Sequence, residues 1–267
     1  MRKYLNKILD SFGYQIVKKK EKITKELIEI TNSFVMSGNY KNIKLNFNKL
    51  TKQKNLIDKS WTSRDISSKL LGFYEEQVQK ECISLKESYS LKNLVHFGAS
   101  DGYHSIGLTK NFLFQKSLVF EIDSFSRRML ERNIIENKLA NKILLFKEAN
   151  FVDVNNNIVS PEFKNTLYLV DIEGHEFDLF TEENLIFFKN SYLLIENHEF
   201  LIVDTVKKKN FFNLLNAHFN ISYLANSSRN PYLLREIDHF HDEDRWALVS
   251  EGRPCNMNWL VCKPKNN

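Results

Sequence analysis

The chain has 267 residues, of which 42% are hydrophobic and 27% charged, so it can bury a sizeable core and is not globally disordered. The low glycine and proline counts (8 and 4) exclude collagen-like and low-complexity chains, and a net charge of +5 is too mild to indicate nucleic-acid binding by itself. Three scattered cysteines are too few for a disulfide framework, which favours a reducing, cytoplasmic compartment.

Residues 1–60 are predicted to form a helical and irregular appendage. No run approaches the roughly 18 apolar residues of a transmembrane helix, and none near the start is long enough for a signal peptide. Apolar residues between Tyr4 and Phe12 recur at helical spacing beside Arg2, Lys3 and Lys7. They predict a solvated terminal helix; the alternative is a basic amphipathic helix in peripheral contact with an anionic membrane.

A second domain is predicted over residues 61–267. It opens with a long helix, because apolar side chains recur every four residues from Ile66 to Cys82, and Asp65 is expected to cap its N-terminus. From Leu94 onward short apolar runs alternate with amphipathic segments. The expected strands are 94–97, 118–121, 143–146, 166–171, 192–197, 220–224 and 258–262. The expected helices are 103–114, 124–137, 176–188 and 203–217. Buried strands that alternate with helices predict a doubly wound, Rossmann-like α/β sheet.

A glycine-bearing loop, Gly98-Ala99-Ser100-Asp101-Gly102, joins the first predicted strand to its helix. Glycines at this point let the backbone turn sharply and approach a ligand closely. The G-x-x-x-G spacing lacks the third glycine of dinucleotide sites and the lysine of phosphate-binding loops. Glu121 lies 19 residues further on, at the end of the second strand, where an acid can accept hydrogen bonds from both ribose hydroxyls. Loop and acid together indicate a nucleoside site; the alternative is a plain turn beside a surface acid.

Four ordered motifs, HFGASDGYHSIGL, VFEID, LVDIEGHEFDL and LLIENHE, followed by NWLVCKP, resemble the FkbM family of S-adenosylmethionine-dependent methyltransferases. The resemblance implies seven strands, the last antiparallel. It implies that the Gly98–Gly102 loop wraps the methionine part of the cofactor and that Glu121, followed by Ile122, holds the ribose. Glu148 and Ala149 match the adenine side. Most such enzymes carry an acid where this chain has His96, which cannot serve as that anion. Either Asp101 or a backbone carbonyl replaces it, or the affinity for the cofactor is reduced. The alternative to a cofactor contact is that His96 is a structural residue at the strand end.

Polar side chains end the fourth and fifth predicted strands, at the edge of the sheet where ligands bind in doubly wound folds. Methyl transfer to a hydroxyl needs alignment and removal of a proton, for which Glu173, His175 and His198 are the candidate bases. A second route is a Mg²⁺ ion on Asp171, Glu196 and Asn197 that lowers the pKa of the acceptor. The alternative is that Asp171 and Glu173 merely cap the next helix.

The connection from Asn226 to Met257 is too long for a hairpin and is predicted to form a lid over this crevice. The resemblance to the FkbM family implies O-methylation of a hydroxyl on a sugar or other small-molecule or glycan acceptor. Basic residues are dispersed along the chain without an aromatic-basic stripe, so no nucleic-acid partner is expected. The rival is a catalytically silent nucleoside-binding or scaffold protein of the same fold.

Overall fold

The computed structural model describes residues 15–47, 62–253 and 255–265, which group into two compact units. Unit 1 combines the chain up to Tyr74 with Ser228–Gly252, and unit 2 comprises Glu75–Ser227 and the chain from Arg253 onward. The predicted boundary after residue 60 and the predicted helix near the start both lie outside the described residues and stay predictions. Within the described ranges, no helix is long and apolar enough to cross a membrane.

Unit 1 is helical. Helices α2 (Gln15–Thr31), α4 (Thr62–Leu71) and α12 (Asp242–Val249) pack against one another, and the short 3-10 turns η4 (Pro231–Leu233) and η5 (Arg235–Ile237) precede α12. Asp65 lies inside the first turn of α4, so the prediction that it caps this helix was wrong. Its carboxylate forms a buried ion pair with Lys69 one turn later, at 2.7 Å. The segment predicted to form a lid belongs largely to unit 1. Its placement over the crevice stays a prediction.

The single long helix predicted from residue 66 to beyond residue 82 is broken in the structure. Helix α4 ends at Leu71 and α5 begins at Glu76. Gly72 adopts a φ of 83°, and a Cβ at this position would lie 2.2 Å from the backbone oxygen of Ser37. Glu75 also has a left-handed backbone, with a φ of 47°. The apolar stripe continues across the break, which is why the pattern concealed it.

Unit 2 is built on one seven-stranded sheet, which confirms the predicted fold class. The strand order is β3-β2-β1-β4-β5-β7-β6. The bounds are β1 Asn93–Phe97, β2 Lys116–Phe120, β3 Ile143–Phe146, β4 Thr166–Val170, β5 Tyr192–Glu196, β6 Phe219–Ala225 and β7 Asn258–Pro264. The first five strands pair in parallel, and β7 runs antiparallel to both of its neighbours. The carboxyl ends of β1, β2, β4 and β5 therefore meet at one edge.

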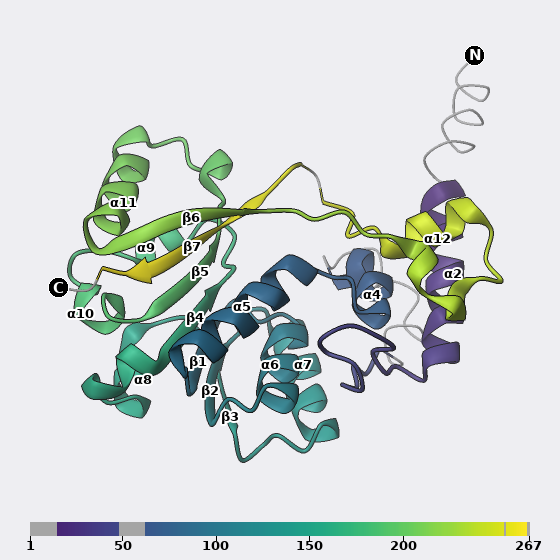
Figure 1. The fold of residues 1–267 in the computed structure, drawn as a ribbon, viewed down its shortest axis with the longest axis horizontal. Coiled ribbons are helices and arrows are strands. Elements are labelled where there is room, and N and C mark those ends of the chain that lie inside the picture. Colours follow the sequence, from purple (N-terminus) through teal and green to yellow (C-terminus); the bar gives the residue numbers. More distant parts are fainter. Residues whose placement is uncertain (1–14, 48–61, 254, 266–267) are drawn as a thin grey trace. The chain divides into compact units, whose positions relative to one another are not determined.

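Helices cover both faces of this sheet, as α/β alternation requires. Figure 1 shows α5 (Glu76–Tyr89), α6 (Tyr103–Asn111) and α7 (Ser124–Glu136) on one side, with α8 (Phe151–Asn157), α9 (Glu176–Leu179), α10 (Leu185–Phe188) and α11 (Thr205–His218) on the other. Short 3-10 turns, η2 (Ser160–Asn165) and η3 (Glu199–Leu201), complete the connections.

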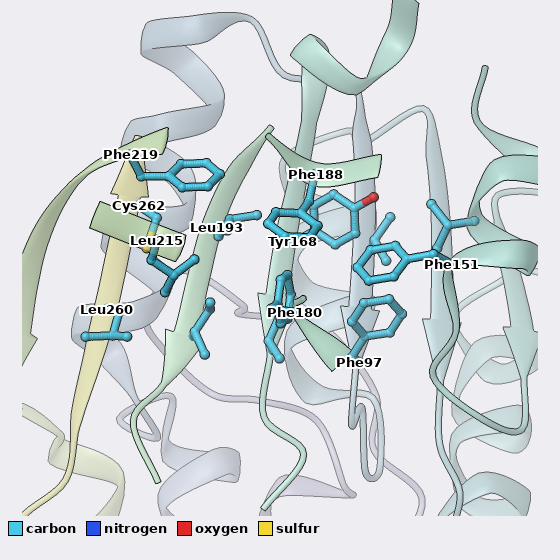
Figure 2. Close-up of a cluster of buried hydrophobic side chains, with 14 of the residues drawn as sticks. Phe97, Phe151, Tyr168, Phe180, Phe188, Leu193, Leu215, Phe219, Leu260 and Cys262 are labelled. Carbon is cyan, nitrogen blue, oxygen red and sulfur yellow. The ribbon is translucent and has the colours of Figure 1, made fainter. Parts of the chain in front are cut away.

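The helix predicted over residues 176–188 is wrong as one element, because the chain leaves the helix at Phe180. That residue is extended and buries its ring against Phe188, with centroids 4.9 Å apart. Phe151 packs beside both rings, with centroids 5.8 Å from Phe180 and 5.6 Å from Phe188. Figure 2 shows these rings within a buried hydrophobic cluster that also includes Leu193, Leu260 and Cys262. Such rings remove large apolar areas from water and hold the sheet rigid beneath the site.

Candidate functional site

The loop between β1 and α6 needs its two outer glycines. Gly98 has a φ of 81°, and a Cβ there would lie 1.7 Å from the backbone oxygen of Asp171. Gly102 has a φ of 90°, and a Cβ there would meet the Leu130 side chain at 2.4 Å. Ser100, at the centre, is also left-handed with a φ of 49°. The two glycines adopt positive φ angles without strain, whereas the left-handed backbone of Ser100 is strained, and such non-glycine residues cluster at ligand sites.

Glu121 follows β2 directly and is joined to this loop. Its Oε2 accepts a hydrogen bond from the Ser100 N–H at 2.6 Å, and its Oε1 accepts one from the Asp123 N–H at 2.7 Å. The residue is only 8% exposed. Burial raises the pKa of Glu121 and outweighs the two N–H donors, which lower it. Each carboxylate oxygen keeps acceptor capacity for a further donor.

Ile122 and the two residues expected on the adenine side, Glu148 and Ala149, follow the ends of β2 and β3. Ile122 comes immediately after Glu121 and is 67% exposed. Glu148 is exposed and Ala149 half-buried, two and three residues after β3 ends. The structure thus places them after the ends of adjacent strands, and their contacts with a nucleoside stay a prediction.

His96 is a buried residue of β1, only 3% exposed. Its Nδ1 lies 2.6 Å from the Ser105 hydroxyl in α6. Burial, with a contribution from nearby His104, lowers the pKa of His96 well below 6.5, so the ring is neutral near neutral pH. Asp101 is also buried, and its Oδ1 accepts a hydrogen bond from the Tyr103 N–H at the start of α6.

Four carboxylates surround His198, whose side chain is fully buried. Its Nδ1 lies 3.0 Å from Glu176 Oε1. On the other side of the ring, Nε2 lies 3.3 Å from Glu196 Oε2, 3.5 Å from Glu173 Oε2 and 3.8 Å from Asp171 Oδ1. We call Asp171, Glu173, Glu176, Glu196 and His198 the acid cluster. The polar residues that follow β4 and β5 therefore meet around one imidazole.

The charges of the acid cluster are strongly coupled. Burial lowers the pKa of His198, but Glu176 and Glu196 outweigh it and raise that pKa to about 11. Burial, together with nearby Glu196, raises the pKa of Asp171 well above its usual value. Burial also raises the pKa of Glu173, whose side chain is 59% exposed. A buried histidine among acids of unequal proton affinity is an arrangement that functional sites share.

Two predicted site residues are directed elsewhere. The His175 side chain is 81% exposed, and its charged neighbour is Asp178 at 3.9 Å. The Asn197 side chain donates to Asn258 Oδ1 at 3.2 Å and accepts from the Glu199 N–H at 3.2 Å. Neither residue shares the contacts that join the acid cluster.

Sequence reasoning did not single out Arg253, Glu75 or Glu176. Arg253 follows unit 1 in the chain and ion-pairs with both Glu196 and Glu75, two buried carboxylates of unit 2. Glu75 also lies 2.7 Å from His104 Nε2 in α6. Glu176 was part of a quoted motif without a role. Its Oε2 accepts from the Gly174 N–H at 3.0 Å while Oε1 contacts His198. Only a folded chain brings these residues together.

No protein-family model and no curated protein matches the chain. Solved structures that resemble it include an O-methyltransferase from Bacillus cereus in complex with SAH, with 13% identity, 70% of this chain and 80% of that chain covered, and a TM-score of 0.46. Another is a tRNA (m1A58) methyltransferase from Aquifex aeolicus, with 11% identity, 72% and 69% coverage, and a TM-score of 0.44.

A third is cofactor-bound Rv0187 from MTB, with 10% identity, 82% and 95% coverage, and a TM-score of 0.48. Likenesses at this level carry no argument about activity. The sheet carries the argument for the fold: its strand order and its antiparallel β7 are those of Rossmann-like methyltransferases.

Proposed function

We propose that this protein is an S-adenosylmethionine-dependent methyltransferase of FkbM type that methylates a hydroxyl of a sugar or other small metabolite. The observation that carries the proposal is Glu121. It is a buried carboxylate at the end of β2, fixed by the N–H groups of Ser100 and Asp123. Carboxylates at this place in Rossmann-like sheets accept hydrogen bonds from ribose hydroxyls.

The residues present fit the nucleoside end of this cofactor. S-adenosylmethionine, when bound, supplies a methyl group on a positively charged sulfur. The strained Gly98–Gly102 loop would face its amino-acid part, Glu121 its ribose, and exposed Ile122 offers an apolar surface to the adenine. His96 is neutral and buried, so it supplies no anion for the methionine amino group, and backbone carbonyls of the loop would serve instead.

The acid cluster supports the second half of the proposal, removal of a proton from the acceptor hydroxyl. Without a bound cation, His198 holds its proton near neutral pH because its pKa is about 11. It is therefore a poor base in that state. Glu173 has a raised pKa and a half-exposed side chain that an acceptor can reach, which suits a general base. Phe200 is 52% exposed, and its ring lies 6.0 Å from that of His198, so it offers the acceptor an apolar contact next to the acid cluster.

The predicted Mg²⁺ ion would need a third ligand besides Asp171 and Glu196. Asn197 was the candidate, and its amide group is engaged with Asn258 and the Glu199 N–H. Magnesium on those three residues therefore stays a prediction.

Two measurements test the proposal. Calorimetry with S-adenosylhomocysteine tests the cofactor, and a methyl-transfer screen against hydroxylated metabolites tests the reaction. Glu173→Gln should bind S-adenosylhomocysteine like the parent protein and lose transfer at least 100-fold, as the removal of a general base does. Glu131→Gln, at an exposed position of α7 outside both the acid cluster and the predicted cofactor site, is the matched control and should keep transfer. Binding without transfer to any acceptor would favour the catalytically silent alternative.

A further inference from the structure

The acid cluster contains buried polar atoms that the surrounding protein leaves without hydrogen bonds. His198 Nε2 and Asp171 Oδ1 are such atoms among the described residues. Three carboxylates lie within 4 Å of Nε2, yet none meets hydrogen-bond geometry with it. A buried polar atom without a partner costs free energy, so a native structure that holds two such atoms face to face calls for a ligand between them.

The contact at His198 Nδ1 leaves the opposite nitrogen, Nε2, available to a ligand. Nδ1 contacts Glu176 Oε1 at 3.0 Å, and Glu176 is itself fixed by the Gly174 N–H and is 1% exposed. With Nδ1–H donating to Glu176, Nε2 presents its lone pair to the cluster. Metal-binding histidines typically donate their second N–H to a carboxylate in this way, which fixes the ring and strengthens the donor nitrogen.

The separations of the donor atoms suit one small cation. One ligand atom each from Asp171, Glu196 and His198 lies within 4.8 Å of the others. Metal–ligand bonds of about 2.0–2.2 Å place neighbouring ligand atoms about 3–4 Å apart. Nε2 is 3.3 Å from Glu196 Oε2 and 3.8 Å from Asp171 Oδ1. Arg253 binds Oε1 of Glu196 and thereby leaves Oε2 as the atom that faces the histidine.

We propose that Asp171, Glu196 and His198 bind a divalent first-row transition ion, of the class of Mn²⁺, Fe²⁺, Co²⁺ or Zn²⁺, in preference to Mg²⁺. Two carboxylate oxygens and one imidazole nitrogen favour such ions, whereas Mg²⁺ prefers an all-oxygen shell. Glu173, 3.5 Å from Nε2 and half-exposed, lies where it can complete the shell or leave room for an acceptor oxygen. The inference rests on the proposed function only for the role of the ion in activating a hydroxyl, not for its binding.

Direct metal binding tests this site without any turnover. The full-length protein, freed of metal by a chelator, is titrated with Co²⁺ alone, and the visible absorption of bound Co²⁺ is recorded. We expect one ion per chain and no displacement by a 100-fold excess of Mg²⁺. Glu176→Gln should weaken Co²⁺ binding 10- to 100-fold because it changes only the carboxylate behind the histidine. Asp171→Asn should weaken it at least tenfold. His175→Ala, which removes an exposed histidine outside the cluster, should leave the affinity within twofold.

Circular dichroism confirms that each variant is folded. His198→Ala should abolish specific Co²⁺ binding. Should it fail to fold, the shape-conserving Glu176→Gln and Asp171→Asn variants still decide the matter. The inference is overturned if millimolar Co²⁺ gives no specific absorption, if both conservative variants bind as the parent does, or if Mg²⁺ competes on equal terms. A separate titration of the metal-free protein with S-adenosylhomocysteine shows whether the proposed function stands or falls independently.

Discussion

Replacing Arg253 by methionine should destabilise unit 2, because it removes the cation that pairs with two buried carboxylates. Its guanidinium, only 15% exposed, joins Glu75 and Glu196, whose side chains are 2% and 4% exposed. Removing one member of a buried ion pair costs about 3–5 kcal/mol, because the partner charges are left buried without compensation. Methionine keeps much of the volume of the arginine stem, so lost charge rather than a cavity dominates the effect.

The pKa of Glu196 shows that its charge is stabilised in the folded protein, by His198 as well as by Arg253. Burial raises that pKa, but His198 and Arg253 outweigh burial and hold it at about 2, against an ordinary 4.5. Each pKa unit corresponds to 1.36 kcal/mol, so the net depression amounts to about 3 kcal/mol in total. Because the pKa in the folded state is depressed, this stabilisation is complete above pH 4.5 and is lost as the pH falls toward 2. The comparison therefore belongs at pH 7.5.

Urea unfolding of metal-free protein, followed by circular dichroism, measures the effect. Lys80→Met is the matched control, because it removes the same charge from the same unit. Its partner Glu76 is 26% exposed and Lys80 itself 64%, so the loss should stay below about 1 kcal/mol. A free energy of unfolding for Arg253→Met within 1 kcal/mol of the parent value would refute the argument that Arg253 compensates two buried carboxylates.

Three further predictions follow from the fold and the nucleoside site. Glu121→Gln should weaken S-adenosylhomocysteine binding by roughly 1.5–3 kcal/mol in calorimetry. Since the pKa of Glu121 is raised, the affinity of the parent protein should fall as the pH drops toward 5. An affinity that stays constant from pH 8 to 5 would speak against the ribose role. Gly98→Ala should displace the loop or unfold unit 2, because its Cβ would meet the Asp171 backbone at 1.7 Å; a parent-like melting temperature and affinity would contradict the geometry. Phe188→Ala should cost about 3–5 kcal/mol in urea unfolding, because a fully buried ring is removed; a loss below 1 kcal/mol would show that the site collapses readily.

The strands of the sheet could be predicted because buried parallel strands form nearly continuous apolar runs. Every predicted strand is present within one or two residues of its expected ends. The helices were harder, since their breaks depend on tertiary contacts. The break at Gly72 follows from its close approach to Ser37, more than 30 residues earlier, and the one at Phe180 follows from the burial of its ring. Helix α8 carried too short an apolar pattern to be predicted.

The site could be predicted as a place but not as a set of contacts. Strand ends that carry Asp171 and Glu196 are visible in the sequence, and parallel pairing brings them together. Which ring nitrogen of His198 faces which carboxylate depends on the register of β4 and β5 and on the turn at Gly174. Arg253 and Glu196 are 57 residues apart in the sequence, and the Ser228–Gly252 segment of unit 1 lies between them in the chain. No local sequence pattern could therefore predict their pairing.

A crystal structure of the protein with S-adenosylhomocysteine tests the central claim most directly. The account predicts that the adenosine lies across the carboxyl ends of β1 and β2, with one or both ribose hydroxyls within about 2.5–3.0 Å of the Glu121 carboxylate. The hydrogen bonds from Ser100 and Asp123 to that carboxylate should persist in the complex. A ribose bound away from Glu121, or a crevice that stays empty at saturating ligand in a folded protein, would contradict the account.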